Sequence, residues 1–267
     1  MIHLRSVALK ESSHREAAFP FTVPAIQTLP TVTFEAPVTF FVGENGSGKS
    51  TLLEGLATAM KLPAVGAGRV EDDETLAAQR RLGGALQLVW NKRTHRGFFL
   101  RAEDFFGFAK SLARMRAELL GRLREIDATY GGRSEMARAL AKGPAASSLS
   151  DLEHRYGADL DANSHGQSFF HLFRSRFVPG GLYLLDEPEA PLSPQSQLGF
   201  IAMLRDMLSQ EAQFIIATHS PILLAFPGAQ IVTFDETPVR RTSYEQLEHV
   251  ALTRDFLQDP ERFLRRL

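Results

Sequence analysis

Apolar and polar positions divide the chain into three regions with different periods. From about 1 to 100, short apolar runs rich in Val, Phe and Thr alternate with Pro and Gly and predict strands: TVTFEAPVTFFV, ALQLVW and RGFFL. From about 104 to 162, Ala, Leu, Arg, Glu and Met dominate, which predicts helices. From 180 onward, the runs GLYLLD, QFIIAT and QIVTF predict buried strands, with a helical stretch between the first two. A strand, a helix and a strand in this order predict parallel pairing in an α/β sheet.

One break interrupts the helical region. The stretch KGPAASSLSD places Gly143 and Pro144 ahead of several Ser residues and an acidic residue. This composition predicts a loop followed by a new helix start.

The segment FFVGENGSGKSTLLEGLA joins a strand pattern to a helical one, and residues 43–50 in it fit G-x-x-x-x-G-K-[ST]. Glycines at these positions let backbone N–H groups point inward and form an anion nest at a helix N-terminus. Lys49 would then reach the β- and γ-phosphates of a nucleotide, and the Ser50 hydroxyl would ligate Mg²⁺. The phosphate-binding residues expected from this P-loop are Gly43, Glu44, Asn45, Gly46, Ser47, Gly48, Lys49, Ser50 and Thr51.

Two carboxylates follow the apolar run of GLYLLDEPEA. A buried strand of this kind carries its C-terminal tip to the ligand crevice of an α/β sheet. Asp186 would hold the water shell of Mg²⁺, and Glu187 would orient or deprotonate the attacking water. The alternative is an ordinary turn, because Asp-Glu-Pro also ends strands. The P-loop upstream favours the catalytic interpretation.

A further buried strand, FIIATHSPILL, delivers Thr218 and His219 at its tip. A single His at a strand end is more often structural than catalytic. Here a parallel sheet would bring that tip to the same edge as Asp186. We therefore expect His219 to hydrogen-bond the γ-phosphate and the attacking water.

Composition narrows the class of protein. The net charge of −1 gives no whole-chain signal for nucleic acid or a membrane, and the absence of Cys excludes disulfides and thiolate metal sites and fits a cytoplasmic location. The N-terminal stretch lacks an apolar signal core, and the longest apolar runs are too short and too interrupted to cross a bilayer. We expect no direct membrane insertion. The chain ends 48 residues after His219, from which we expect no nuclease domain appended behind these motifs.

The segments GENGSGKST, NSHGQ, LLDEPEAPLSP and ATHSP, in this order, resemble the ABC-type ATPases, in particular the soluble branch around the RecF/SMC-like and predicted AAA-family ATPases. The resemblance extends from about residue 20 to about residue 235 and is weakest in the helical middle. It implies that the site binds ATP and Mg²⁺ and hydrolyses the ATP. It also implies an ATP-dependent homodimer, because in that family the signature pentapeptide of one subunit caps the ATP held by the P-loop of another.

NSHGQ stands where that family has its signature pentapeptide, LSGGQ. Ser164, Gly166 and Gln167 match it, whereas Asn163 and His165 depart from it. A Ser hydroxyl and free N–H groups at a helix start suit a γ-phosphate. The alternative is a simple helix N-cap.

Two other positions depart from the family. The resemblance places the magnesium-side Gln just after a strand some tens of residues beyond the P-loop, where this chain offers Glu103, with Gln87 as a competitor. Transporter subunits read close to DEPTSALD, whereas DEPEAPLSP here puts Ser193 where the Asp would stand. The second departure favours a soluble ATPase over a transporter subunit.

The helical middle is locally basic. Residues 80–142 hold fourteen Lys or Arg against six Asp or Glu, a balance of +8. Such a stretch would attract nucleic acid phosphates; the alternative is a solvated helical face balanced by acid elsewhere. Phe105 and Phe106 are expected in a core, with docking of an unidentified protein partner as the alternative.

Together these observations predict an α/β fold: a P-loop NTPase with a mostly parallel sheet flanked by helices, plus a small helical subdomain of the ABC ATPase type. We expect a single ABC-type ATPase domain over residues 1–267, with a helical subdomain inserted at 104–165 that carries the signature motif at its end. Three outputs stay open: a soluble ATPase in DNA-related or defence processes, the ATP-binding subunit of an ABC transporter with a separate permease, and a non-catalytic ATP-dependent switch. The intact Glu187 argues against the switch.

Overall fold

The computed structural model describes residues 1–11, 18–65, 77–156 and 165–265. It divides into two compact units, one formed by Met1–Ala102 with Val178–Leu267 and the other by Glu103–Phe177. The expected helical insertion at 104–165 falls within the second unit, and its role as a subdomain stays a prediction.

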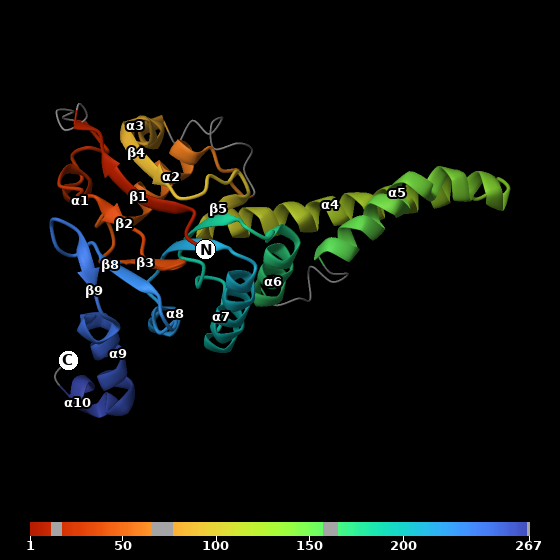
Figure 1. The fold of residues 1–267 in the computed structure, drawn as a ribbon. Helices are drawn as coiled ribbons and strands as arrows, with labels where there is room; N and C mark the ends of the chain where they lie inside the picture. The colour runs from red at the N-terminus through yellow and green to blue at the C-terminus, as the bar shows by residue number, and fades with distance from the viewer. Residues whose placement is uncertain (12–17, 66–76, 157–164, 266–267) are drawn as a thin grey trace. The chain divides into compact units, whose positions relative to one another are not determined.

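A six-stranded sheet organises the first unit (Figure 1). Its strand order is β5-β6-β7-β3-β8-β9, and the first five strands run parallel, whereas β9 is antiparallel to β8. This arrangement confirms the predicted α/β fold with a mostly parallel sheet. The strands are β3 (Val38–Val42), β5 (Gly97–Arg101), β6 (Leu182–Asp186), β7 (Gln213–Ala217), β8 (Gln230–Thr233) and β9 (Arg240–Thr242).

A smaller antiparallel sheet, of order β2-β1-β4, belongs to the same unit. Its strands are β1 (Leu4–Leu9), β2 (Val32–Thr33) and β4 (Leu86–Trp90). The buried Gln213 side chain at the start of β7 accepts the N–H groups of His3 and Leu4 at 2.7 and 2.8 Å and donates to the Leu4 carbonyl at 3.0 Å. One amide thus satisfies backbone groups that would otherwise be buried unpaired between the two sheets.

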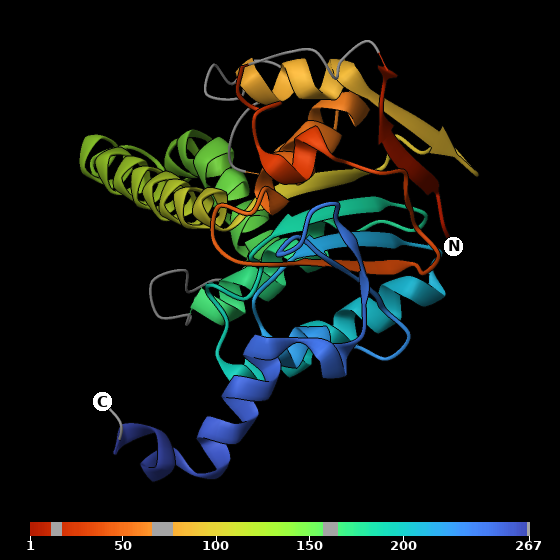
Figure 2. The same ribbon diagram turned by 90° about the vertical axis from the view of Figure 1, so that its left-hand side faces the viewer.

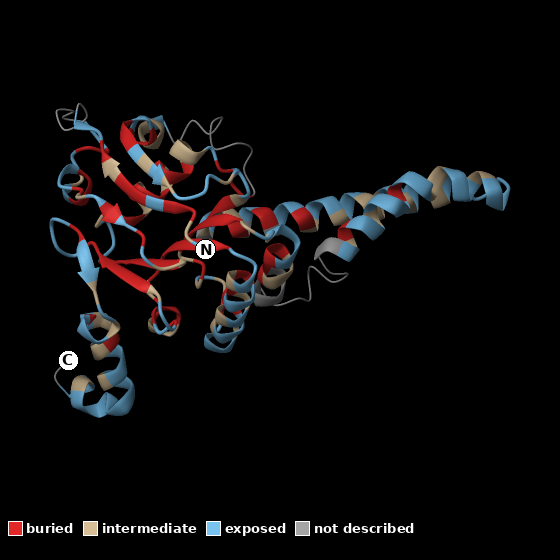
Figure 3. Cartoon of the chain, viewed as in Figure 1, coloured by how far each residue is buried: buried red, intermediate tan, exposed pale blue. Residues whose placement is uncertain are grey.

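Helix α2 (Lys49–Met60) carries much of the core. Leu52, Leu53 and Leu56 on it are fully buried and belong to one cluster with Phe41 and Ile215 of the large sheet. In Figure 3 the buried strands of the large sheet are drawn in red. Figure 2 shows that α7 lies on one face of this sheet and β1 on the opposite face. The remaining helices of the unit are α1 (Pro24–Gln27), α3 (Ala77–Ala85), α7 (Pro194–Ser209), α8 (Pro221–Leu224), the 3₁₀ turn η3 (Tyr244–Gln246), α9 (Glu248–Gln258) and α10 (Pro260–Leu264).

The second unit is helical, with α4 (Ala102–Thr129), α5 (Glu135–Tyr156) and α6 (His165–Arg176). Helices α4 and α5 form an antiparallel hairpin, in which Arg116 pairs with Glu153 at 3.2 Å and Lys142 with Asp127 at 2.6 Å. The Phe105 ring meets Phe169 edge-on at 5.2 Å, and it is buried, which confirms the core interpretation for that residue. The side chain of Phe106 lies outside the described part.

The predicted break at KGPAASSLSD is wrong. Helix α5 runs without interruption through Gly143 and Pro144. A proline inside a helix removes one hydrogen bond and crowds the preceding turn. Contacts on both sides of Pro144 offset this local cost: Lys142 and Glu153 form ion pairs with α4, and the side chains of Ala145 and Leu152 are buried. Across the described ranges, no helix has the length and apolarity needed to cross a membrane.

Candidate functional site

The predicted motifs meet at one edge of the large sheet. The strand register aligns Arg101, Asp186, Ala217 and Phe41 across four neighbouring parallel strands. The chain therefore leaves β6, β7 and β3 on the same side, where α/β sheets bind their ligands. Asp186, His219 and the P-loop are brought together as the sequence predicts.

The P-loop curls between β3 and α2 because three of its glycines adopt positive φ. Gly43, Gly46 and Gly48 have φ of 147°, 80° and 106°. A Cβ on Gly43 would stand 3.0 Å from Asp235 Oδ1 and 3.1 Å from Phe234 Cβ, so both the backbone and the surroundings select glycine there. Gly48, in the left-handed region, directly precedes the first residue of α2 and aims the helix N-terminus into the loop.

Lys49 lies inside the loop that it would use to bind phosphate. Its Nζ donates hydrogen bonds to the carbonyls of Gly43 and Glu44 at 2.6 and 2.9 Å, and the residue is only 4% exposed. Burial lowers the pKa of Lys49, while the carboxylates of Asp186 and Glu187 oppose that shift. The amine is thus held at two carbonyls of the loop, and Thr51 follows on the same helix.

Asp186 ends β6 against the start of α2. It is 8% exposed, and burial raises its pKa to about 7, whereas a hydrogen bond with the Ser50 side chain acts in the opposite direction. Its Oδ1 is buried and has no hydrogen-bond partner within the described residues. A hydroxyl and a carboxylate side by side are oxygen ligands suited to Mg²⁺, which completes its coordination with water and nucleotide phosphates. Ser50 and Asp186 therefore fit the expected metal site.

Glu187 and His219 approach each other beyond the strand ends. His219 Nε2 lies 3.8 Å from Glu187 Oε1, and their side chains are 39% and 45% exposed. Glu187 has a positive φ of 49°, and its N–H donates to the Ala217 carbonyl at 2.9 Å. A non-glycine residue in this region is uncommon and marks a constrained backbone. This constrained residue directly follows the last residue of β6, and its side chain is nearly half exposed.

Glu189 was missed by the sequence reasoning. Its Oε1 accepts the Thr218 hydroxyl at 2.7 Å and the His219 N–H at 2.8 Å. Burial raises the pKa of Glu189, and these two hydrogen bonds oppose the shift. The sequence does show a third carboxylate two residues after Glu187. Nothing in the neighbouring residues, however, indicates that its side chain bonds to residues after the next strand.

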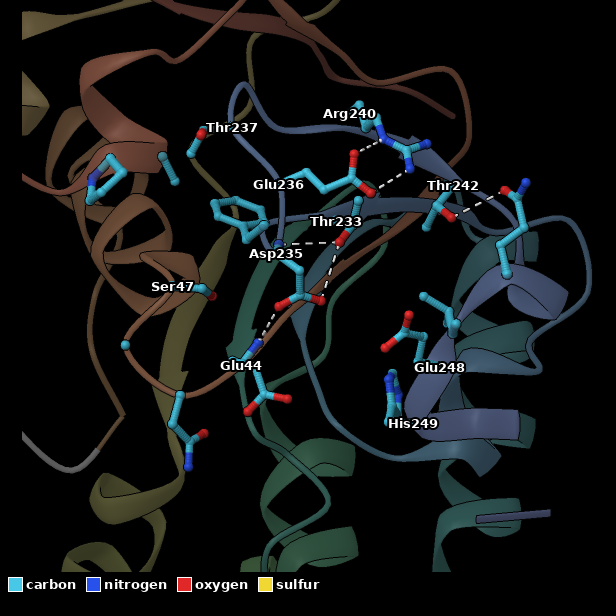
Figure 4. A pocket seen from close by; sticks show the side chains of 17 residues that line it. Glu44, Ser47, Thr233, Asp235, Glu236, Thr237, Arg240, Thr242, Glu248 and His249 are labelled. Carbon is cyan, nitrogen blue, oxygen red and sulfur yellow. Dashed lines mark hydrogen bonds and ion pairs between the residues drawn. The ribbon is translucent and has the colours of Figure 1, made fainter. Parts of the chain in front are cut away.

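Asp235 was missed as well. It follows β8, and its Oδ1 accepts the N–H of Glu44 at 2.6 Å, so a carboxylate fixes the first turn of the P-loop. Beside it opens a pocket of about 750 Å³ between that turn, the β8–β9 connection and the start of α9. Figure 4 shows Glu44 and Asp235 on one side of this pocket and Glu248 and His249 on the other.

Four expected residues belong either to the small sheet or to the second unit. Gln87 is an exposed residue of β4, paired with Ala8 in the small sheet. Glu103 lies in the first turn of α4, and Gly166 and Gln167 lie in the first turn of α6; all three belong to the second unit. Their roles stay predictions, and Ser164 lies outside the described residues.

Ser193, which stands where transporter subunits have Asp, caps α7. Its Oγ accepts the N–H of Ser196 at 3.2 Å. The residue thus has a structural role as a helix N-cap.

Comparison with known proteins agrees with this geometry. A model of the AAA domain family matches residues 26–69, which include the whole P-loop. The cobalt import ATP-binding protein CbiO of Salmonella typhimurium is 27% identical over 237 residues, which cover 83% of this chain and 79% of that protein. The macrolide export ATP-binding/permease protein MacB of Hahella chejuensis is 29% identical over 185 residues, covering 69% of this chain but only 26% of that protein.

Solved structures similar to the chain include a nucleotide-free ATP-binding cassette from an ABC transporter, with a TM-score of 0.47 and 17% identity over 98% of this chain and 97% of that one. They also include the Smc head domain of Pyrococcus furiosus, with a TM-score of 0.47 and 11% identity over 96% of this chain and 100% of that one. The order of the motifs, their convergence at one sheet edge and the sequence relatives agree with an ABC-type P-loop ATPase.

Proposed function

We propose that this chain binds ATP with Mg²⁺ and hydrolyses it to ADP and phosphate. The observation that carries the proposal is the convergence of a buried lysine, a hydroxyl–carboxylate pair and a Glu–His pair at adjacent strand ends. These are Lys49, Ser50 with Asp186, and Glu187 with His219.

Each residue has a role that follows from its position. Lys49 exchanges its contacts to two loop carbonyls for the β- and γ-phosphates, which carry full negative charge. Ser50 and Asp186 hold Mg²⁺, which neutralises charge on the phosphates when bound. Glu187 orients or deprotonates the attacking water, and His219 hydrogen-bonds the γ-phosphate beside it.

The proposal includes assembly. Ser164, Gly166 and Gln167 belong to the resemblance to the signature pentapeptide, which caps the nucleotide of a neighbouring subunit. On that basis the active species is an ATP-dependent homodimer in the cytoplasm, with Glu103 as the expected magnesium-side residue.

Lys49→Ala tests the nucleotide site. We expect this variant to lose measurable affinity for Mg-ATP in isothermal calorimetry, because the loop loses its fixed positive charge against the phosphates. Lys92→Ala removes an exposed lysine and is the matched control. Glu187→Gln should bind Mg-ATP normally but release no phosphate. Undiminished ATP affinity in Lys49→Ala would refute the P-loop assignment.

A transport role is the second candidate, because the relatives named above are a cobalt import ATP-binding protein and a macrolide export ATP-binding/permease protein. The match covers 79% of CbiO, which is named an ATP-binding protein. If the chain serves a permease, Glu187→Gln should co-purify with a membrane protein in the presence of ATP. Lys49→Ala should not retain that partner.

A nucleic-acid output rests on the basic stretch at 80–142, and the structure adds an argument against it. That stretch is split between the two units, and the second unit, 103–177, has eleven Lys or Arg against ten Asp or Glu, a balance of only +1. Arg116 and Lys142 are moreover engaged in ion pairs. This output would be supported if the chain retains DNA at low salt and loses it steeply towards physiological salt. The double variant Arg114→Glu with Arg122→Glu should then not retain DNA.

A further inference from the structure

Four buried polar atoms around the P-loop have no hydrogen-bond partner within the described residues. They are Ser47 Oγ, Asp186 Oδ1, His219 Nε2 and His249 Nε2. Buried polar atoms in folded proteins are almost always paired, so a group of orphaned atoms at one place calls for ligand atoms. The first three belong to residues that the proposed function already places at the nucleotide. His249 belongs to none of the motifs.

The fold brings His249 to this place from the end of the chain. It lies in the first turn of α9, which packs against α8, the helix that begins two residues after His219. The Tyr244 hydroxyl donates to the Pro221 carbonyl at 3.2 Å and ties the segment before α9 to the loop that carries His219. Figure 4 shows the ring on the pocket wall opposite Glu44 and Asp235.

The electrostatic surroundings of His249 are those of the P-loop itself. Burial lowers the pKa of His249, and the neighbouring His219 and Lys49 lower it further, whereas Asp235 and Glu44 raise it. The lowered pKa favours the neutral ring, and a neutral imidazole keeps one N–H donor.

The same pocket is unsuited to a second, independent anion. Its lining includes the carboxylates of Glu44, Asp235, Glu236 and Glu248, and the Glu236 carboxylate already pairs with Arg240, the arginine of that lining. The lining also includes Gly46 and Ser47 of the P-loop, so the place beside His249 that suits an anion is the side of the pocket formed by that loop. The terminal phosphate of a nucleotide in the P-loop would occupy that place.

We propose that His249 Nε2 donates a hydrogen bond to the terminal phosphate of bound ATP, beside His219. This inference rests on the proposed function, because it requires ATP in the P-loop. ADP lacks the terminal phosphate, so this contact distinguishes the two nucleotides. It also links nucleotide state to α9, a helix that lies outside the resemblance to the ATPase family.

The test compares a non-hydrolysable ATP analogue, Mg-AMP-PNP, with Mg-ADP by isothermal calorimetry. We expect His249→Ala to weaken AMP-PNP binding by about tenfold or more, the usual effect of losing a hydrogen bond to a charged group. ADP affinity should change by less than about twofold. His249→Gln keeps an N–H donor at similar reach and should recover most of the loss. Gln258→Ala, at the exposed end of the same helix, is the control.

Equal losses for both nucleotides in His249→Ala, or no loss, would overturn the inference. A second readout uses the unmodified protein with ¹⁵N-labelled histidines, of which the chain has eight. The His249 imidazole signal, assigned by its loss in His249→Gln, should shift with AMP-PNP and not with ADP. An unmoved signal would overturn the inference even if the Ala variant misfolds. If the unmodified protein binds neither nucleotide, the proposed function itself fails; if it binds both and only Lys49→Ala abolishes binding, the inference alone fails.

Discussion

The backbone N–H of His219 donates a 2.8 Å hydrogen bond to Oε1 of Glu189, a residue from the turn after the neighbouring strand. The same oxygen accepts the Thr218 hydroxyl. Glu187, two residues before Glu189, faces the His219 ring at 3.8 Å. The two strand ends that supply Glu187 and His219 are therefore joined by one buried carboxylate.

Replacing Glu189 should lower both stability and turnover. Glu189→Ala leaves the Thr218 hydroxyl and the His219 N–H without their acceptor, which costs about 1–3 kcal/mol for each buried group. We expect a loss of stability in urea unfolding and a lower kcat for ATP hydrolysis. Glu189→Gln retains a carbonyl acceptor and should lose less. Glu118→Ala, an exposed carboxylate on α4, is the control. Normal turnover in Glu189→Ala would show that this bridge does not position His219.

The raised pKa of Asp186 predicts a pH-dependent stability in metal-free protein. Its folded pKa is about 7, against about 3.9 in an unfolded chain. Between these values the folded state binds more protons than the unfolded state, so the contribution of Asp186 to stability falls as pH rises through that window. Asp186→Asn, which cannot ionise, should therefore be more stable than the unmodified protein at pH 8 in EDTA. The difference, at most on the order of 4 kcal/mol, should vanish near pH 4. A difference that does not depend on pH would contradict the assignment.

Much of the sheet and the motif edge could be predicted because their signals are local. The apolar runs around Phe41, Leu184 and Ile216 are strands buried on both faces, and each is followed at once by its polar residues. Parallel pairing then brings Asp186 and His219 to the P-loop without further information.

The parts that could not be predicted depend on contacts distant in sequence. Asp235 caps an N–H 191 residues away, and Glu189 reaches the next strand. The continuity of α5 through Pro144 depends on ion pairs to α4. His249 lies beyond every recognisable motif, and only the packing of α9 against α8 places it at the pocket.

Gly43→Ala should destabilise the P-loop more than its small added volume suggests. Its φ of 147° disfavours a side chain, and the new Cβ would press on Asp235 and Phe234. We expect a cost of about 1–3 kcal/mol, measured by thermal or urea unfolding, and weaker nucleotide binding. Gly84→Ala is the matched control, because its Cβ would meet open space within α3. That variant should be neutral or more stable by up to about 1 kcal/mol. Equal effects of the two substitutions would show that the loop conformation is not constrained at Gly43.

In the proposed function the pentapeptide NSHGQ caps the nucleotide of a neighbouring subunit, and this role can be tested by mixing inactive variants. Glu187→Gln keeps the shape of the site but removes the base. In the presence of ATP this variant should therefore accumulate as a stable dimer, which light scattering detects. If Ser164 caps the nucleotide of the partner, Ser164→Arg would bring a bulky side chain against its γ-phosphate. That variant should bind ATP as a monomer, without dimerising or hydrolysing it.

Mixing Lys49→Ala with Ser164→Arg creates dimers in which an intact P-loop meets an intact pentapeptide at one of two sites. About half of randomly paired dimers are mixed, so up to about a quarter of the unmodified rate should return. Mixing Lys49→Ala with Glu187→Gln is the matched control, because Lys49 and Glu187 act on the same nucleotide within one chain, and no mixed dimer restores both at one site. A monomeric Glu187→Gln at saturating ATP, together with a fully active Ser164→Arg, would make the pentapeptide an ordinary helix cap. Recovery in the first mixture and none in the second would instead show that each chain completes the active site of the other.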